Sequence, residues 1–280
     1  MNRKDITDKI VTSLEQGHIP WRSSFARIAH RNLFSQKRYK GINQFLLSLN
    51  IDASPYWATF AQWRAAGCGV RKGEKASAVI YYKTIEKIND DDERITYPFM
   101  RYYSIFHIGQ VDDPDGKFQD LLDTVIETDF ETANHIIQAS GADIRIGGNM
   151  AFYSPDENYI RIPTASQFTS EEERIATVLH ELGHWAERNI LGHERPKEDH
   201  HSEYAFGELV AEMTACFLCQ TCGVPSDIKN HESYIGRWLK AMKNDTGYIF
   251  QASKMASQIA DGILERAGMT VDNEVEVCAA

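Results

Sequence analysis

Two histidines and a glutamate in the pattern H-E-x-x-H are the strongest chemical signal in this sequence of 280 residues. They are His180, Glu181 and His184. Residues four apart share one face of a helix, so both imidazoles can point the same way and hold one zinc ion. Glu181 lies beside the first histidine and is placed to take a proton from a water molecule. The motif therefore predicts a zinc metallopeptidase centre with Glu181 as the catalytic residue.

The residues around the motif predict the helix that it needs. A capping box just upstream, formed either by Thr169 with Glu172 or by Ser170 with Glu173, predicts where this helix starts. Apolar residues then recur with helical period, and Gly192 ends the pattern. The motif is thus expected in the middle of a helix.

A catalytic zinc site needs a third protein ligand and an open position for water. A histidine six residues after His184 would be one solution, but Ile190 occupies that position. Glu208 and Glu212 follow, four residues apart in a largely apolar helical segment. We expect Glu208 to bind the metal and Glu212 to orient a ligand histidine, with Glu212 as the alternative ligand.

Composition and charge predict a folded protein of two unlike halves. Hydrophobic residues make up 42% of the chain and charged residues 25%, as in ordinary folded domains. Residues 1–110 carry 17 Lys and Arg against 10 Asp and Glu, a balance of +7, whereas residues 111–280 carry 13 against 30, a balance of −17. A basic half beside an acidic half suggests that only the first meets a polyanion.

The sequence predicts a cytoplasmic protein. Its polar start is no signal peptide, and no apolar run approaches membrane-spanning length. Five cysteines without a targeting signal are typical of reduced thiols. We therefore expect no membrane partner.

An acidic stretch with Pro and Gly at 111–116 marks the change of charge and reads as a linker. It divides the chain into a DNA-binding domain at 1–112, a linker at 113–124 and a metallopeptidase domain at 125–280. The expected fold class is α+β.

Strand-like runs support this class. Those at 78–83 and 97–108 predict a hairpin with an acidic loop at 89–93. In the second half we expect an edge strand near 151–153 and another strand near 159–162.

Cations alternate with aromatic residues in the first half, as a single-strand binder requires for phosphates and unstacked bases. A basic solvated surface over an aromatic core would have the same composition, so the motifs must decide. The residues expected to contact DNA are Arg38, Lys40, Trp63, Arg64, Arg71, Lys72, Lys75 and Arg101.

Short motifs in a fixed order run along nearly the whole chain. In the first half they are Pro20-Trp21, Tyr39-Lys40-Gly41-Ile42-Asn43, Trp57-Ala58-Thr59-Phe60, and Val70-Arg71-Lys72-Gly73-Glu74-Lys75. In the second half they are Ala151-Phe152-Tyr153, Ile160-Arg161-Ile162-Pro163, the segment from His180 to Trp185, and Glu208-Leu209-Val210-Ala211-Glu212. With these motifs the sequence resembles the ArdC family of antirestriction proteins, which are carried by conjugative plasmids and related mobile elements.

The resemblance implies an N-terminal domain that binds single-stranded DNA without sequence preference. It also implies a zincin-like metallopeptidase domain similar to the DNA-dependent SprT/Spartan proteases, and a role in protecting entering plasmid DNA from restriction. The sequence departs from the family at Gly207, where a second acidic residue is frequent, so the third ligand rests on Glu208. It departs again at Ser23-Ser24-Phe25, which replaces a Trp-rich segment.

Two other functions remain open from the sequence. One is a DNA-activated protease acting on DNA-bound or regulatory proteins. The other is a pure DNA-shielding protein whose zinc is structural. Cys216, Cys219 and Cys222 resemble a metal-binding run but are expected to be core residues. Residues considered for stabilising an oxyanion are His193, His200, His201, His231, Tyr204 and Tyr234.

Overall fold

The computed structural model describes residues 2–24, 26–49, 54–88, 94–122, 126–193, 201–226 and 232–269. Helices and strands both contribute to it, and the predicted α+β class is confirmed. Among these residues, no helix has the length and hydropathy that a membrane span requires.

The first half is built around a sheet of four strands in the order β1-β2-β5-β4. Strands β4 and β5 form one long antiparallel ladder, which confirms the predicted hairpin, while its loop at 89–93 lies outside the described residues. A second ladder joins β3 to β6. The bounds are β1 (Arg31–Asn32), β2 (Tyr56–Thr59), β3 (Gly69–Val70), β4 (Ser77–Ile88), β5 (Arg94–His107) and β6 (Val111–Asp112).

Short helices complete this half. Helix α1 begins with a capping box in which the Asn2 side chain accepts from the backbone N–H of Asp5 and the Asp5 carboxylate accepts from the backbone N–H of Asn2. Thr59 and Gln62 form the same device at the start of α3. The bounds are α1 (Arg3–Glu15), α2 (Ile42–Ser48) and α3 (Phe60–Ala65), with single 3-10 turns at η1 (Ile108–Gln110) and η2 (Gln119–Leu121).

The second half is mainly helical, with a small sheet in the order β7-β9-β8. Strand β9 pairs in parallel with β7 and antiparallel with β8, so β8 is an edge as predicted, while β7 was not anticipated. The bounds are α4 (Phe130–Ala139), β7 (Asp143–Ile146), β8 (Phe152–Ser154), β9 (Tyr159–Ile162), η3 (Ala165–Gln167), α5 (Glu171–Asn189), α6 (His201–Cys222), α7 (Glu232–Asn244) and α8 (Tyr248–Arg266).

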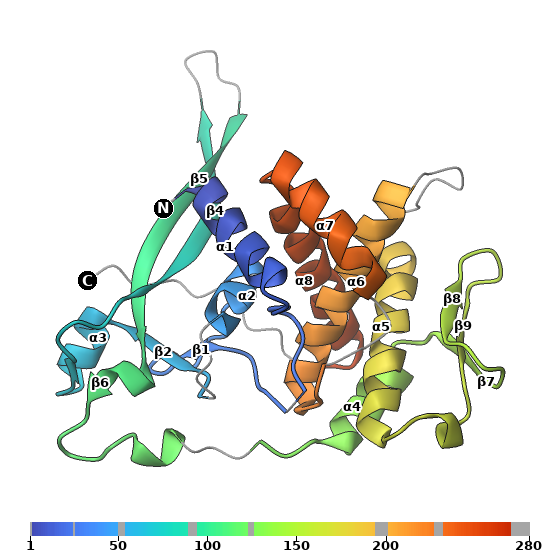
Figure 1. Ribbon diagram of the computed structural model, residues 1–280, viewed down its shortest axis with the longest axis horizontal. Coiled ribbons are helices and arrows are strands. Elements are labelled where there is room, and N and C mark those ends of the chain that lie inside the picture. The colour runs from blue at the N-terminus through green and yellow to red at the C-terminus, as the bar shows by residue number, and fades with distance from the viewer. Residues whose placement is uncertain are drawn as a thin grey trace.

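The two halves share one hydrophobic core. Side chains of α1 and α2, together with Trp21, are buried in the same cluster as those of α5, α6, α7 and α8. Figure 1 shows α1 and α2 between the β4–β5 hairpin and these helices, and α1 contacts α7 while α2 contacts both β4 and α8. The beginning of the chain is therefore part of the support for the helices that carry the H-E-x-x-H motif.

The segment expected to be a linker packs against the first half. Val111 and Asp112 form β6, and the ring of Phe118 lies 5.8 Å from that of Trp63 and 6.0 Å from that of Phe34. The Lys117 ammonium donates to the carbonyl of Ala66. As far as residue 122, this segment is anchored by aromatic packing and hydrogen bonds, because its apolar side chains complete a second small core. Residues 123 and 124 lie outside the described residues.

Candidate metal centre

Helix α5 carries the motif on a face that is almost entirely buried. It starts where the second capping alternative predicted, because the Ser170 hydroxyl accepts from the backbone N–H of Glu173. The Glu173 carboxylate in turn accepts from both the backbone N–H and the hydroxyl of Thr169. The helix ends at Asn189, and Gly192 follows it with a φ of 67°.

Gly183, inside the motif, allows α6 to approach α5 closely. A β-carbon at this position would lie 3.2 Å from Cα of Ala211 and 3.3 Å from Cβ of Thr214. Glycine inside a helix costs about 1 kcal/mol relative to alanine. At this position the close contact of two helices offsets that cost and brings Glu208 opposite the histidines.

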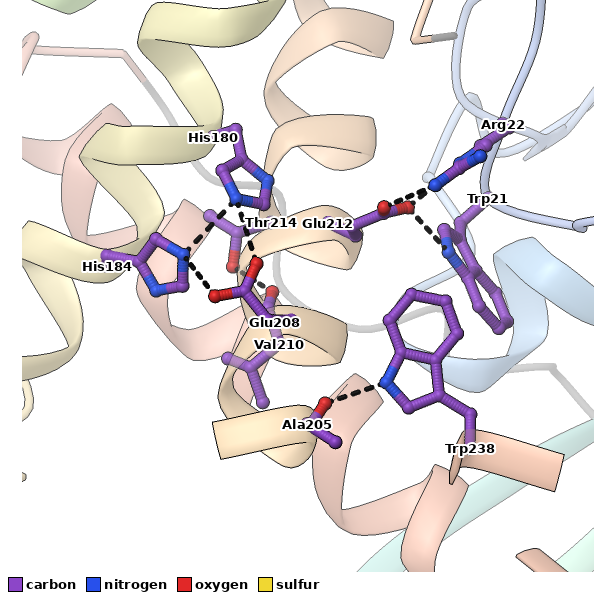
Figure 2. A network of polar contacts seen from close by, with 10 residues as sticks. All are labelled: Trp21, Arg22, His180, His184, Ala205, Glu208, Val210, Glu212, Thr214 and Trp238. Carbon is purple, nitrogen blue, oxygen red and sulfur yellow. Dashed lines mark hydrogen bonds and ion pairs between the residues drawn. The ribbon is translucent and has the colours of Figure 1, made fainter. Parts of the chain in front are cut away.

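His180, His184 and Glu208 converge on one point (Figure 2). The two Nε2 atoms are 3.2 Å apart, and the Glu208 carboxylate oxygens lie 3.5 Å from Nε2 of His180 and 3.4 Å from Nε2 of His184. Tetrahedral ligands at about 2 Å from a zinc ion are separated by about 3.3 Å. The donor set and its spacing therefore suit a divalent metal.

The electrostatics of the cluster keep Glu208 ionised. Burial opposes the charged carboxylate, but the imidazoles of His184 and His180 outweigh burial and hold the pKa of Glu208 well below its ordinary value. Tyr204 lies one turn earlier on α6. Its pKa is raised by burial and by the neighbouring Glu208 carboxylate, so its phenol keeps its proton at neutral pH.

Glu212 lies one turn beyond Glu208 and meets a different set of partners (Figure 2). The Arg22 guanidinium donates to both of its oxygens, at 3.1 and 2.6 Å, and the Trp21 indole donates at 3.0 Å. The side chains of Arg22 and Glu212 are only 9% and 2% exposed. Within the described chain, the group of three metal-type donors contains Glu208 and not Glu212.

Glu181 is buried at 8% exposure, next in sequence to His180. Among the three donors, His184 has the most exposed side chain, at 14% against 3% for His180 and 6% for Glu208. The cluster thus has one side closer to solvent, where a substrate could approach.

The residues predicted to contact DNA divide into three groups. Arg64, Lys72, Lys75 and Arg101 are exposed. Arg71 is also exposed, but its guanidinium bonds with the carbonyls of Val111 and Gly109 and with Glu74.

Arg38 and Lys40 form the second group, and they face the helices of the other half. Arg38 donates to the hydroxyl of Thr221 on α6, and Lys40 forms a 3.0 Å ion pair with Asp261 on α8. Both are half-buried, so they join the two halves of the molecule.

Trp63 stands apart from both groups, and for this residue the predicted DNA contact is wrong. Its side chain is 0% exposed, and its indole donates to the carbonyl of Phe106. The six-residue helix α3 turns this side chain into the core formed with Phe118 and Val111. A base cannot stack on a ring that protein atoms cover on all sides.

The three cysteines and the residues considered for stabilising an oxyanion lie in different surroundings. Cys216, Cys219 and Cys222 are free and buried in the core, as expected. His193 pairs with Glu187 at 2.9 Å. Tyr204 is 51% exposed and its ring lies 5.7 Å from that of Tyr234. The side chain of His201 is not described, and His200 and His231 lie outside the described residues.

Sequence reasoning missed the contact of Trp21 and Arg22 with Glu212. As a ring and a cation of the first half, both fit the composition expected of a DNA surface. Glycine at 183, inside a helical pattern, was the available signal of a close helix contact. The pairing of positions 22 and 212 left no local signal.

A buried two-histidine helix, a glutamate helix and a three-stranded sheet with an exposed edge define a zincin-like metallopeptidase domain. Residues 131–255 match the family model described as zincin-like metallopeptidase, and residues 1–106 match the N-terminal domain of anti-restriction factor ArdC. The chain belongs to the ArdC family.

Solved structures and sequences agree with this assignment. The metal-free antirestriction ArdC protein from plasmid R388 superposes with a TM-score of 0.80, at 32% identity over 95% of this chain and 97% of that one. Its Mn(II)-bound form gives 0.77, at 31% identity over 95% and 98% of the two chains.

Among curated proteins, the DNA primase TraC of Escherichia coli is 32% identical over 93% of this chain, which spans only 27% of the length of that primase. The uncharacterised protein y4eC of Sinorhizobium fredii (strain NBRC 101917 / NGR234) is 29% identical over 98% of this chain and 95% of its own length.

Proposed function

We propose that this chain is an antirestriction protein of a mobile element that binds single-stranded DNA non-specifically and carries a zinc metallopeptidase centre. The observation that carries the proposal is the convergence of His180, His184 and Glu208 beside Glu181, in a chain whose first half is basic. Membership of the ArdC family supports the same conclusion.

His180, His184 and Glu208 would hold the metal, and two imidazoles with one carboxylate suit zinc. A bound metal supplies Lewis-acid activation of water and of a peptide carbonyl. Glu181 would take the proton from the attacking water and return it to the leaving amine. A carboxylate beside the ligand pair is unnecessary in a purely structural site, which favours catalysis.

The remaining side chains would position a peptide substrate. Strand β8 is an edge of the small sheet, and an extended peptide can add to such an edge through backbone hydrogen bonds. Phe152 on β8 is 37% exposed and offers an apolar contact there. The phenol of Tyr204, which keeps its proton, is a donor for an oxyanion close to Glu208.

Exposed cations of the first half would bind the strand. Arg64, Lys72, Lys75 and Arg101 are the predicted contacts that the fold leaves accessible. Binding through phosphates is independent of sequence and weakens as salt rises, because bound counterions are released. Coverage of this kind would protect an entering strand from restriction endonucleases.

A DNA-activated peptidase is the second candidate, and one observation favours it. Arg22 and Trp21 belong to the half that would bind DNA, yet they hold Glu212 one turn from Glu208. A strand that shifts the first half would therefore act on the helix that carries a metal ligand. The substrate would then be a DNA-bound or regulatory protein.

Glu181→Gln separates these functions. The variant keeps the three metal donors and the basic surface but loses the proton acceptor. If protection is coverage, it protects single-stranded plasmid DNA as well as the wild type, which is the result we expect. If protection is proteolytic, the variant loses it at unchanged zinc content and DNA affinity.

Two further measurements complete the test. Full protection by the wild type at one molecule per many binding sites would exclude coverage. Incubation of both proteins with cell extract, with and without single-stranded DNA, reveals the peptidase as fragments made only by the wild type. The absence of wild-type-specific fragments under both conditions would contradict the peptidase assignment.

A further inference from the structure

A groove of about 530 Å³ lies where the two halves meet, away from the candidate metal centre. The β4–β5 hairpin forms one wall, the start of α2 forms the base, and α8 forms the other wall. Helix α2 contacts both β4 and α8, as the arrangement in Figure 1 illustrates. Its size is in the range of ligand sites.

The groove has apolar side chains on its walls and cations beside them. Ile80, Met100 and the half-buried rings of Tyr81 and Phe250 line it from opposite walls. Among the described residues, three cations line it against a single carboxylate, Asp261, which is paired with Lys40 at 3.0 Å. Arg3 and Lys254 are the two remaining cations, and both are exposed. This combination fits a ligand with flat apolar rings and negative charges.

The same chemistry continues along the hairpin. Arg101 on β5 lies directly opposite Tyr81 on β4 in the ladder, so the two side chains share one face. Tyr103 is two residues from Arg101 on that face, with its ring 5.2 Å from the Arg101 guanidinium and 6.4 Å from the ring of Tyr81. One cation and two rings therefore lie together on the hairpin face that carries Tyr81, a residue of the groove wall.

The groove is held open by hydrogen bonds within the protein. The Asn43 side chain at the start of α2 donates to the carbonyl of Ile80 and accepts from its backbone N–H, each at 2.8 Å. This closes the outer edge of β4 at that point and fixes the hairpin to α2. Across the groove, the Arg3 guanidinium lies 5.5 Å from the centre of the Phe250 ring. A preformed site of this kind needs little reorganisation on binding.

We propose that the groove between the hairpin and α8 is a binding site for single-stranded DNA, so that the metallopeptidase half supplies part of the DNA surface. Bases stack on Tyr81 and Phe250, while Arg3 and Lys254 contact phosphates. Gln251 and Gln258, exposed amides on the same wall, bond with bases or sugars. The charge of the groove favours an anionic ligand. Residues 111–280 carry a balance of −17, yet the α8 wall places Lys254 at the groove. The inference rests on the proposed DNA-binding function.

The experiment measures binding of a fluorescent oligothymidylate to the full-length protein by anisotropy at several salt concentrations. Lys254→Glu, on the groove wall, is compared with Lys240→Glu, a lysine on α7 that is also exposed but does not line the groove. We expect Lys254→Glu to weaken binding at least tenfold and to reduce the salt slope by about 0.7 or more. Lys240→Glu, which makes the same change of net charge outside the groove lining, stays within about threefold of the wild type, because salt screens exposed charges.

A second variant tests stacking. Phe250→Ala should weaken binding at least fivefold without changing the salt slope, because stacking releases no counterions. An oligonucleotide carrying 5-iodouracil should photocrosslink to peptides containing Tyr81 or Phe250. Circular dichroism of each variant checks that the fold is kept.

The outcomes separate the groove from the proposed function. If Lys254→Glu and Lys240→Glu weaken binding equally, the groove is not the DNA-binding site, and the change in net charge explains the effect. If Lys72→Glu with Lys75→Glu weakens binding while Lys254→Glu and Phe250→Ala do not, DNA binding stands and the groove is refuted. A wild type that fails to bind the strand at low salt contradicts both.

Discussion

The two buried glutamates of α6 sit in different surroundings although they lie only four residues apart. Glu208 meets His180 and His184 of α5, whereas Glu212 meets Trp21 and Arg22 from the beginning of the chain. Each residue is at most 5% exposed, so each carboxylate needs partners to remain charged. The imidazoles can also bind a metal, but a guanidinium cannot, so the partners and not the helix decide which glutamate is available to a metal.

The residues around Glu212 also hold α6 in position. The indoles of Trp21 and Trp238 pack edge to face at 5.8 Å, and Trp238 donates to the carbonyl of Ala205 on α6 (Figure 2). The position of Glu208 on α6 therefore depends on Trp21 and Arg22, which lie outside the segment 131–255 that matches the metallopeptidase family.

Arg22→Ala should lower the free energy of unfolding by about 3–5 kcal/mol, because it leaves the Glu212 carboxylate buried without its charge partner. Urea unfolding followed by tryptophan fluorescence measures the change. Arg22→Met combined with Glu212→Leu should recover most of the loss, since an apolar pair needs no compensation. A double variant as unstable as Arg22→Ala would show that the pair is not what the fold requires.

His30, in the first half, extends the comparison to a buried base. Burial, aided by Arg27 and His107, lowers the pKa of His30 to about 3. The Trp57 indole donates to its Nδ1 at 3.1 Å, which fits the neutral ring. The unfolded chain binds the proton near pH 6.5, so stability is present above that pH and is lost as pH falls toward 3.

Between pH 7 and pH 5, this one group should cost about 2 kcal/mol of stability. His30→Gln removes the titration, so its loss of stability over the same interval should be smaller by that amount. Urea unfolding at both pH values gives the comparison. If wild type and variant lose the same free energy of unfolding, the pKa of His30 in the folded protein is not lowered.

Ser170→Ala should produce the smallest effect, a loss of about 1 kcal/mol, because it removes the hydroxyl that accepts from the Glu173 backbone at the start of α5. Ser166→Ala, in the exposed turn η3, is the matched control and should be near neutral. Thermal unfolding of the two variants measures the difference. A zinc affinity altered by Ser170→Ala would extend the influence of this cap to the motif.

Features set by neighbouring residues could be predicted from the sequence. The period of α5, its cap and the β4–β5 hairpin arise from spacing within a few residues, and the structure contains them. The proximity of Glu208 to the histidines followed from the requirement for a third ligand near an H-E-x-x-H helix. That requirement alone did not decide between Glu208 and Glu212 as the ligand.

Features set by distant partners could not be predicted. Trp63 was expected to contact DNA, because composition does not tell which way a six-residue helix turns its tryptophan. Arg38 and Lys40 were expected to contact DNA, but their partners Thr221 and Asp261 lie more than 180 residues away in sequence. Strand β7 has alternate charged residues and gains its place only by pairing with β9.

The zinc affinities of Glu208→Gln and Glu212→Gln show which of the two carboxylates binds the metal. Competition with a chelator gives both dissociation constants, under conditions where circular dichroism shows each variant folded. Loss of a residue that only supports ligands changes metal affinity about 10- to 100-fold. We predict that Glu208→Gln exceeds about 100-fold, while Glu212→Gln remains near the lower limit of about tenfold. A greater loss for Glu212→Gln would contradict the account and move the ligand to the other side of α6.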